Sequence, residues 1–378
     1  MKKWLASVAA AACLSSCIYP FTPDLPSSYD RTVVVEGRIL IGGISTIQLS
    51  YVTPLDQYRP DMPVGQAYIE DNAGNIYRPA EGGGFYFNFY STQDIPHSAA
   101  SSVTYRAVVQ ADGETYVSDW IAPDPAPTID AIHFSADNAS VYVTVDLDPG
   151  RKNTGYLGCT FQETWRFHAE IYPEYFIDPQ TWVYGNYLDS GIDYPYYWCW
   201  RTFSPGYIFL FDYRDFEEGP VKGLPLFSFS RADTRNHQRY SILVTAFALS
   251  REAYDYNKQI QELADIGGDL FSPEPGALVG NLRCESNPDL PVMGMVLAAE
   301  TTQKRAFVNS SRYLISRAPS VVFEQVKRED MPRFYRDGYR PSILVDFEDG
   351  SDIGWVHVRC IDCIQAGGTQ ERPDFWED

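Results

Sequence analysis

The stretch TVVVEGRILI, residues 32–41, indicates the fold class of this chain. It is rich in β-branched residues, and Gly42 and Gly43 end it. Runs of this kind favour strands, since branched side chains pack well on a pleated surface. The segment that follows, residues 45–53, alternates apolar and polar residues and predicts a second strand with one buried face.

Short strand segments separated by turns continue as far as the proline-rich segment 123–127. Besides the first two, they are residues 64–70, 76–78, 84–89, 103–109 and 115–118. Asp112 and Gly113 form a typical hairpin turn, and the spacing of the strands resembles an immunoglobulin-like or transthyretin-like sandwich. We therefore expect a mostly β fold, with an N-terminal β-sandwich at 31–122 and a larger β-rich domain at 128–378.

One segment of the larger domain predicts a helix, near residues 250–266. Ser250 can accept the free N–H groups of a first turn, and Glu252 sits where the helix dipole favours a negative charge. Apolar residues recur at helical spacing, and Gly267 and Gly268 end the pattern. The larger domain should therefore contain one helix among its strands.

The first residues predict export and lipid anchoring. Lys2 and Lys3 precede an apolar run that is too short to span a bilayer, and the sequence LSSC ends at Cys17. This layout resembles the bacterial lipoprotein signal, whose cysteine is acylated and becomes the new N-terminus. We expect a signal peptide at 1–16, lipidation of Cys17 and an extended tether at 17–30. An ordinary signal peptide with an incidental cysteine is the alternative.

The acidic composition limits the kinds of partner. The chain of 378 residues has a formal net charge of -20, which argues against nucleic acid or anionic lipid headgroups as the main partner. After Cys17, no apolar stretch of the sequence reaches the length needed to span a membrane. The lipid on Cys17 is then the expected attachment to the membrane.

Residues 156–216 form an aromatic-rich segment, the best candidate for binding. Tyrosine and tryptophan supply rigid contact area and are frequent at interface hot spots, and their flat rings can stack on sugars. The segment contains the run YPYYWCW at 194–200, which cannot all point into a core because strand neighbours alternate faces. Core packing accounts for part of the segment. The candidate ligand- or partner-binding residues are Tyr194, Tyr196, Tyr197, Trp198 and Trp200.

Five cysteines follow Cys17, and an odd number leaves at least one unpaired. The candidates for disulfides are Cys159, Cys199, Cys284, Cys360 and Cys363. We expect a Cys159–Cys199 pair, with Cys284 near Cys360 and Cys363. The spacing of Cys360 and Cys363 also fits half of a zinc site or a redox pair, but a disulfide that pins the C-terminal tail is the favoured interpretation.

Signatures of catalysis and of metal binding are missing from the sequence. There is no GxSxG, HExxH or GxxxxGK[ST] motif, and the histidines are scattered. Acidic residues at 71–75 and 346–352 have calcium-like spacing, but hairpin turns use the same residues and neither segment matches the EF-hand loop. We therefore expect no catalytic residues, no metal and no cofactor. A carboxylate pair for glycoside hydrolysis is the enzymatic alternative.

Several short motifs together resemble one known family. They are Val34-Val35-Glu36-Gly37, Gln162-Glu163-Thr164-Trp165, Tyr240-Ser241-Ile242-Leu243-Val244, Ser250-Arg251-Glu252-Ala253-Tyr254-Asp255-Tyr256, Pro275, Gly280-Asn281-Leu282, Cys360-Ile361-Asp362-Cys363, Gly367-Gly368-Thr369 and Arg372-Pro373-Asp374-Phe375-Trp376. Their order and spacing are similar to those of the DUF4249 lipoproteins of Bacteroidetes. Met293-Gly294-Met295 departs from the pattern, where an aromatic residue is expected after the glycine. The resemblance implies an accessory of a TonB-dependent outer-membrane transporter.

The expected function is that of an outer-membrane lipoprotein, a non-enzymatic accessory that binds cargo for a TonB-dependent transporter. The aromatic segment would supply the contact surface, and the cell surface is favoured over the periplasmic face. One alternative is an independent lipoprotein that binds a glycan or a peptide, and another is a hydrolase with a carboxylate site. A nucleic-acid partner is not expected.

Overall fold

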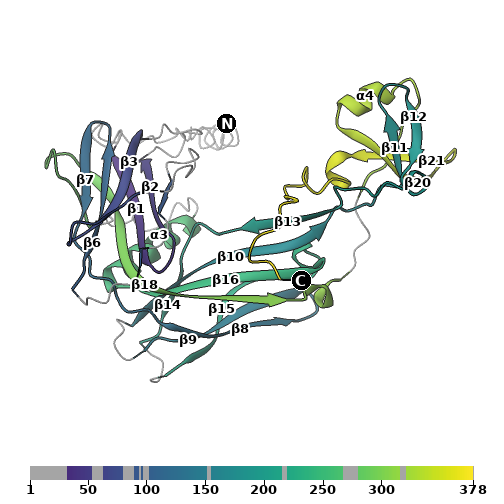
Figure 1. Ribbon diagram of the computed structural model, residues 1–378. Coiled ribbons are helices and arrows are strands. Elements are labelled where there is room, and N and C mark those ends of the chain that lie inside the picture. Colours follow the sequence, from purple (N-terminus) through teal and green to yellow (C-terminus); the bar gives the residue numbers. More distant parts are fainter. Residues whose placement is uncertain are drawn as a thin grey trace, which may run out of the picture.

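The computed structural model describes residues 32–52, 63–79, 89–92, 95–96, 102–150, 155–214, 219–266, 280–315 and 321–377. These residues form mostly strands, which confirms the mostly β class. Figure 1 shows three β-rich parts in a row, which we name the N-terminal sandwich, the central sandwich and the distal module. The signal peptide at 1–16, the tether at 17–30 and the lipidated Cys17 lie outside the described residues.

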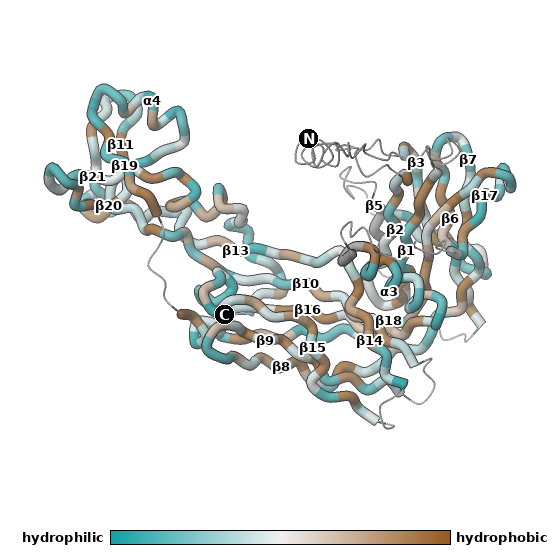
Figure 2. The backbone as a smooth tube through the Cα atoms, turned by 180° about the vertical axis from the view of Figure 1, so that it is seen from behind, coloured by the Kyte–Doolittle hydropathy of each residue, from teal (hydrophilic) through white to brown (hydrophobic). Residues whose placement is uncertain are grey.

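The N-terminal sandwich packs two sheet layers face to face. One layer contains β1 (Val33–Ile41), β2 (Ser45–Tyr51), β5 (Phe89–Thr92) and the first half of β18 (Val292–Val308). The other contains β17 (Leu282–Cys284), β7 (Glu114–Ser118), β6 (Tyr105–Ala111), β3 (Gly65–Asp71) and β4 (Ile76–Tyr77). Val35 and Ile39 of β1 are fully buried between the layers, because alternate side chains of a strand point to one face. Figure 2 shows how hydrophobic residues recur along strands such as β1.

Strand β18 joins the N-terminal and central sandwiches. Its first half pairs with β1 in parallel, with Val33 opposite Val292, and its second half pairs antiparallel with β16 (Arg239–Ala248). The sandwich expected from residues 31–122 alone therefore takes in two strands, β17 and β18, from beyond the proline-rich segment 123–127. Periodicity could not reveal this, because it predicts the buried face of a strand and not its partner.

Gly294 lies where β1 and β18 approach most closely. Its φ is +116°, and a Cβ at this position would lie 1.9 Å from the carbonyl oxygen of Val35. Only glycine combines that backbone conformation with that approach. The glycine of the Met293-Gly294-Met295 segment is thus required by the contact between the two strands.

The central sandwich places a curved sheet over a three-stranded one. The first contains β13 (Trp198–Phe203), β10 (Tyr156–His168), β16 and the second half of β18, with β14 (Phe209–Asp212) beside β10. The second contains β15 (Val221–Ser230), β9 (Ser140–Asp148) and β8 (Thr128–Ala136). The carboxylate of Glu163 is buried between them, with its Oε1 2.8 Å from Arg235 Nε and accepting a hydrogen bond of 2.8 Å from the Tyr240 hydroxyl.

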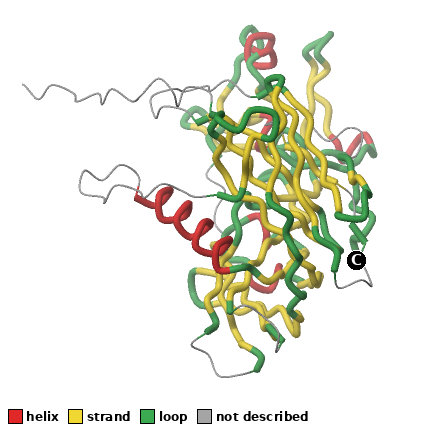
Figure 3. Tube along the Cα trace, turned by 90° about the vertical axis from the view of Figure 1, so that its left-hand side faces the viewer, coloured by secondary structure: helices red, strands yellow, loops and turns green. Residues whose placement is uncertain are grey.

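Helix α3 (Arg251–Ile266) confirms the helix expected near residues 250–266. The Ser250 hydroxyl oxygen accepts the backbone N–H of Ala253 at 3.1 Å and so caps the first turn. Ala253 and Tyr256 are buried, and Figure 3 shows the helix lying along the outside of the strands. The other helical segments among the described residues are short: α2 (Tyr187–Ser190), α4 (Met331–Arg336), η2 (Thr234–Asn236), η3 (Ser310–Tyr313) and η4 (Val358–Cys360).

The distal module is assembled from two separate parts of the chain. The first, between β10 and β13, contains β11 (Tyr175–Asp178), β12 (Val183–Asn186) and α2. The second, after β18, contains β19 (Glu324–Gln325), α4, β20 (Tyr339–Phe347) and β21 (Gly350–His357). Trp355 is fully buried between the two parts, and its indole N–H donates to the hydroxyl of Tyr184 at 2.9 Å. This bond, and that from Glu174 N–H to the Ser342 carbonyl, hold the parts together.

The C-terminal tail, residues 361–377, returns from the distal module to the central sandwich (Figure 1). The backbone N–H and carbonyl of Thr369 pair with those of Trp200. The buried ring of Trp376 then meets Trp200 and Phe307 edge-on, at centroid distances of 6.4 and 5.8 Å. The tail is thus packed against the sheet by its aromatic end.

Candidate functional site

The aromatic run at residues 194–200 is divided among different environments. Tyr194 and Tyr196 line a cavity beside the distal module. Tyr197 instead packs against the core of the central sandwich and stacks on His168, with ring centroids 5.0 Å apart. The alternation of side chains along extended backbone explains the division.

Trp198 and Trp200 lie outside this cavity. They lie on one face of β13, and both rings contact the guanidinium of Arg166, at 4.9 and 5.2 Å from its central carbon. Trp200 also contacts the tail through Trp376. Their contacts are those of a cation–π stack that secures the sheet face and the tail.

The cavity has a volume of about 440 Å³, which is within the range of small-molecule sites. We name it the tyrosine cavity after its five tyrosines: Tyr175, Tyr187, Tyr194, Tyr196 and Tyr335. The rest of the lining is Pro173, Phe176, Ile177, Arg340, Pro341, Val358, Ile361, Asp362 and Gln365. Both parts of the distal module, the segment before β13 and the start of the tail contribute to it.

Ring contacts hold the tyrosines in place. Tyr194 meets Tyr187 and Tyr196 edge-on, with centroids 5.4 and 5.7 Å apart, and its backbone N–H donates to the hydroxyl of Tyr172 at 3.2 Å. Tyr187 also packs against Phe176 at 4.9 Å. Such tilted and edge-on pairs are favourable and fix the orientation of each ring. The lining is therefore largely formed before any ligand arrives.

The hydroxyls of the five tyrosines are not used by the described part of the fold. Within the part of the chain that the structure describes, none of them makes a hydrogen bond. Structural tyrosines elsewhere do: the hydroxyl of Tyr77 donates to Asp71, and that of Tyr240 donates to Glu163. Five uncommitted hydroxyls around one cavity can donate to, or accept from, a bound molecule.

Opposite charges meet at the same cavity. Arg340 Nη1 donates to the carbonyls of Tyr335 and Tyr339 at 2.8 and 2.7 Å, and its guanidinium carbon lies 3.5 Å from the centroid of the Tyr335 ring. Asp362 Oδ1 accepts the backbone N–H groups of the following turn. Burial, with the nearby carboxylate of Asp362, raises the pKa of Tyr194, so its hydroxyl stays a neutral donor at physiological pH.

The disulfide pattern corrects our expectation. Cys199 and Cys363 form the disulfide of the described residues, with Cα atoms 5.7 Å apart. The expected Cys159–Cys199 pair is wrong, because β10 places Cys159 opposite Phe209 and Cys199 opposite Phe167. Cys159 is fully buried, which raises its pKa to about 12 and keeps it a thiol.

The remaining cysteines are also placed differently from the prediction. Cys284 belongs to β17 of the N-terminal sandwich, far along the molecule from the distal module (Figure 2), and Cys360 is a free thiol. Cys363 pins the tail as predicted, but its partner is Cys199. Because Cys363 is already bonded, Cys360 and Cys363 form neither a redox pair nor half of a zinc site.

Acidic groups that could bind a metal or catalyse hydrolysis do not gather in the described part of the chain. Across the described ranges, no three His, Cys, Asp or Glu side chains gather closely enough to hold a metal ion. The acidic turn at 71–75 has a local explanation, since Asp71 accepts hydrogen bonds from Ala73 and Asn75 N–H, the Asn75 side chain and the Tyr77 hydroxyl. Among the lining residues of the tyrosine cavity, Asp362 supplies the one carboxylate, whereas glycoside hydrolysis uses a pair.

Sequence reasoning found part of this site and missed the rest. Tyr194 and Tyr196 were predicted individually, and Tyr175 and Tyr187 lie inside the aromatic segment 156–216. Tyr335 and Arg340 were missed. They come from α4 and β20, which no local motif connects with the aromatic segment, and only the assembly of the distal module brings them together.

No helix among the described residues is both long and apolar enough to cross a membrane. No curated protein matches the sequence. A family model described as a domain of unknown function, DUF4249, matches residues 18–305, which leaves the C-terminal part of the distal module and the tail outside the match. The match covers more than half of the sequence, and the chain therefore belongs to the DUF4249 family.

Proposed function

We propose that this protein is a non-enzymatic binding protein whose ligand occupies the tyrosine cavity. One observation carries the proposal: five tyrosines line a single cavity of about 440 Å³, and their hydroxyls are not used by the described part of the fold. Rigid aromatic walls with free hydroxyls suit recognition, because little entropy is lost when a ligand binds to groups that are already ordered.

The chemistry of the lining favours a glycan or a peptide. Flat tyrosine rings stack on sugar faces or on peptide groups, and the hydroxyls can hydrogen-bond to either. Arg340 and Asp362 add one positive and one negative group for polar substituents of the ligand. This is the composition of a site that holds a polar molecule with flat or apolar faces.

The proposed setting is the outer membrane. The lipoprotein-like signal that ends at Cys17, the acidic composition and the resemblance to DUF4249 lipoproteins of Bacteroidetes support it. The lipid on Cys17 would hold the protein at the cell surface rather than at the periplasmic face. There it would serve as an accessory of a TonB-dependent transporter, and the tyrosine cavity would capture or retain cargo for it.

A double variant tests the cavity. Tyr194→Phe with Tyr196→Phe keeps both rings and removes two hydroxyls, so the affinity for a cavity ligand should fall by about tenfold or more, at roughly 1 kcal/mol per lost hydrogen bond. Isothermal titration with a panel of soluble oligosaccharides and short peptides would measure it. Tyr142→Phe is the matched control, because the hydroxyl of Tyr142 donates to Asp137 on the exposed surface. A ligand bound equally by wild type and double variant would show that its site is elsewhere.

A separate experiment tests the partnership. Affinity purification of the full-length protein from detergent-solubilised outer membranes should recover a large β-barrel receptor in a stable ratio. The Cys17→Ala variant, which cannot be acylated, should lose both membrane attachment and the receptor. Recovery of the lipidated protein as a monomer alone would contradict the transporter proposal.

The tyrosine cavity also supports a second candidate, an independent glycan- or peptide-binding lipoprotein. This candidate shares the ligand site and differs in the partner. Ligand binding that depends on Tyr194 and Tyr196, together with failure to recover a receptor, would favour it over the accessory role.

A further inference from the structure

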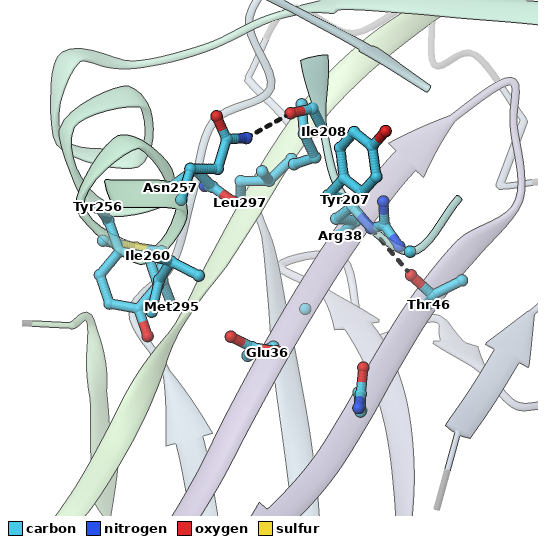
Figure 4. Close-up of a pocket in the computed structure, with 14 residues that line it drawn as sticks. Glu36, Arg38, Thr46, Tyr207, Ile208, Tyr256, Asn257, Ile260, Met295 and Leu297 are labelled. Atoms are coloured by element: carbon cyan, nitrogen blue, oxygen red, sulfur yellow. Dashed lines mark hydrogen bonds between the residues drawn. The ribbon is translucent and has the colours of Figure 1, made fainter. Parts of the chain in front are cut away.

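A second pocket lies under helix α3, on the outer face of the N-terminal sandwich (Figure 4). Strands β1, β2 and β18 form its floor, α3 forms one wall, and the loop around Tyr207 forms another. Its volume is about 140 Å³, the space of about five water molecules. It is a small site, separate from the tyrosine cavity.

Two opposite charges line the floor of this pocket. Glu36 and Arg38 are alternate residues of β1, so their side chains point to the same face of the sheet. Across β2 they are opposite Gln48 and Thr46. Figure 4 shows both side chains on the pocket side of the strand.

Neither charge is neutralised by a direct contact. In the described part of the chain, no ion pair or hydrogen bond joins Glu36 to Arg38. The Nε of Arg38 donates to the Thr46 hydroxyl at 3.3 Å, and neither Nη group makes a hydrogen bond with a residue that the structure describes. Glu36 keeps contact with solvent through the open side of the pocket, yet desolvation raises its pKa and lowers that of Arg38. The two groups attract each other through space, and a ligand that contacts both adds a direct partner to each.

The walls offer further polar groups. The Tyr256 side chain is buried, and its hydroxyl makes no hydrogen bond with any residue the structure describes. Asn257 and Gln261 each use the amide N–H₂, to the carbonyls of Ala253 and Ile208, which leaves each amide oxygen as an acceptor. Ile260, Met295 and Leu297 add apolar surface.

We infer that this pocket binds a free α-amino acid with a small side chain, its carboxylate on Arg38 and its ammonium group on Glu36. The fork of a guanidinium matches a carboxylate, and a carboxylate matches an ammonium group. Residues two apart on a strand are separated by about 6.6 Å, which leaves room for a small zwitterion between their charged ends. The volume of about 140 Å³ matches a small amino acid.

The experiment compares a whole zwitterion with its halves. Isothermal titration of the full-length protein in detergent would use L-alanine and L-serine as probes, with acetate and ethylamine as the halves. The amino acids should bind at least about tenfold more tightly than either half, because only they satisfy both charges. Equal affinity for acetate and alanine would overturn the inference, as would no binding of any small amino acid.

Two charge-neutral variants locate the site. Arg38→Gln and Glu36→Gln should each weaken alanine binding by at least about tenfold. Arg328→Gln and Glu329→Gln are matched controls on the exposed surface of the distal module and should leave it unchanged. Undiminished binding to both pocket variants would overturn the inference. If a pocket variant fails to fold, the comparison of alanine with acetate and ethylamine on the wild-type protein still tests the inference. This inference does not depend on the function proposed for the tyrosine cavity.

Discussion

Glu163 shows how this fold accommodates a charge in the middle of a β-sandwich. Its carboxylate is buried, and Arg235 and Tyr240 contact it from β16 and the segment before it. The guanidinium of Arg235 also lies over the rings of Trp165 and Phe229, 5.0 and 5.1 Å from their centroids. A buried carboxylate is tolerated when its lone pairs are satisfied in this way, and removing one partner is strongly unfavourable.

Tyr240→Phe isolates one of these bonds. It removes the hydroxyl that donates to Glu163 and keeps the ring, so we expect the free energy of unfolding to fall by about 1–3 kcal/mol. Urea denaturation at neutral pH would measure the change. Tyr142→Phe removes an exposed hydroxyl that also donates to a carboxylate, and it should change stability by less than about 0.5 kcal/mol. Similar losses in the two variants would contradict the argument.

His237 should make stability depend on pH. Its ring is stacked on His168, its Nδ1 accepts the His168 backbone N–H at 3.3 Å, and burial followed by the neighbouring His168 lowers its pKa to about 4. Between about pH 6.5 and 4 the unfolded chain therefore binds more protons than the folded one, and acidification destabilises the fold.

The matching variant is His237→Gln, whose amide oxygen can still accept the N–H. From pH 7 to about pH 4.5, wild type should lose on the order of 2 kcal/mol more than the variant, since partial exposure reduces the full linkage. Urea denaturation at both pH values gives the difference. If wild type and variant lose the same amount of stability between the two pH values, His237 is not the titrating group.

At the scale of elements, the local sequence pattern predicted individual strands and the helix, whereas tertiary contacts determine how they are arranged. The helix near residues 250–266 was predictable because Ser250 caps it and its apolar face is periodic. The partner of β1 was not, because a parallel pairing with β18 leaves no sign in the residues between them. Strand β18 is continuous from Val292 to Val308, although it pairs with β1 along its first half and with β16 along its second half.

For the candidate site, too, the local sequence pattern predicted only some of the residues. Aromatic density pointed to Tyr194 and Tyr196. Their separation from Trp198 and Trp200 could not be predicted, because all four have the same parity and only the start of β13 at Trp198 divides them. The Cys199–Cys363 bond was unpredictable for the same reason, because spacing along the chain carries no distance between strands.

Gly294→Ala tests the closest contact between elements. A Cβ at this position meets the carbonyl of Val35, and the positive φ disfavours any other residue, so we expect a loss of at least about 1–3 kcal/mol in the free energy of unfolding. Gly206→Ala is the control, because nothing lies within 4 Å of a Cβ there. Thermal or chemical denaturation of both variants measures the effect. A Gly294→Ala protein as stable as the Gly206→Ala protein would contradict the model of close strand approach.

At the scale of the whole molecule, the tail and the disulfide connect the distal module to the central sandwich. The tail carries Cys363, which is bonded to Cys199 of β13, and it ends at the buried Trp376. The bond closes a loop with a sequence separation of 164 residues. It therefore constrains the unfolded chain strongly and holds one side of the tyrosine cavity, to which Asp362 and Gln365 belong.

Removing this bond should loosen that end of the molecule. For the double variant Cys199→Ser with Cys363→Ser, we expect a loss of about 2–5 kcal/mol in stability and faster tryptic cleavage after Arg359. Mass spectrometry of timed digests would show the cleavage. Cys360→Ser removes a free thiol and keeps the disulfide, so it should behave as wild type. Equal cleavage rates in the two variants would contradict the role of the bond.

The parallel pairing of β1 with β18 also has a consequence for the order of folding. The hydroxyl of Thr301 donates to the carbonyl of Ile41, which lies 260 residues earlier in the chain. When a ribosome or a translocation channel releases the chain from its N-terminus, the first strands must therefore wait for almost all of the rest. Such high contact order slows folding and leaves an edge of β1 open to wrong pairing in the meantime. The N-terminal sandwich, although it is encoded first, cannot be completed until β18 has been released.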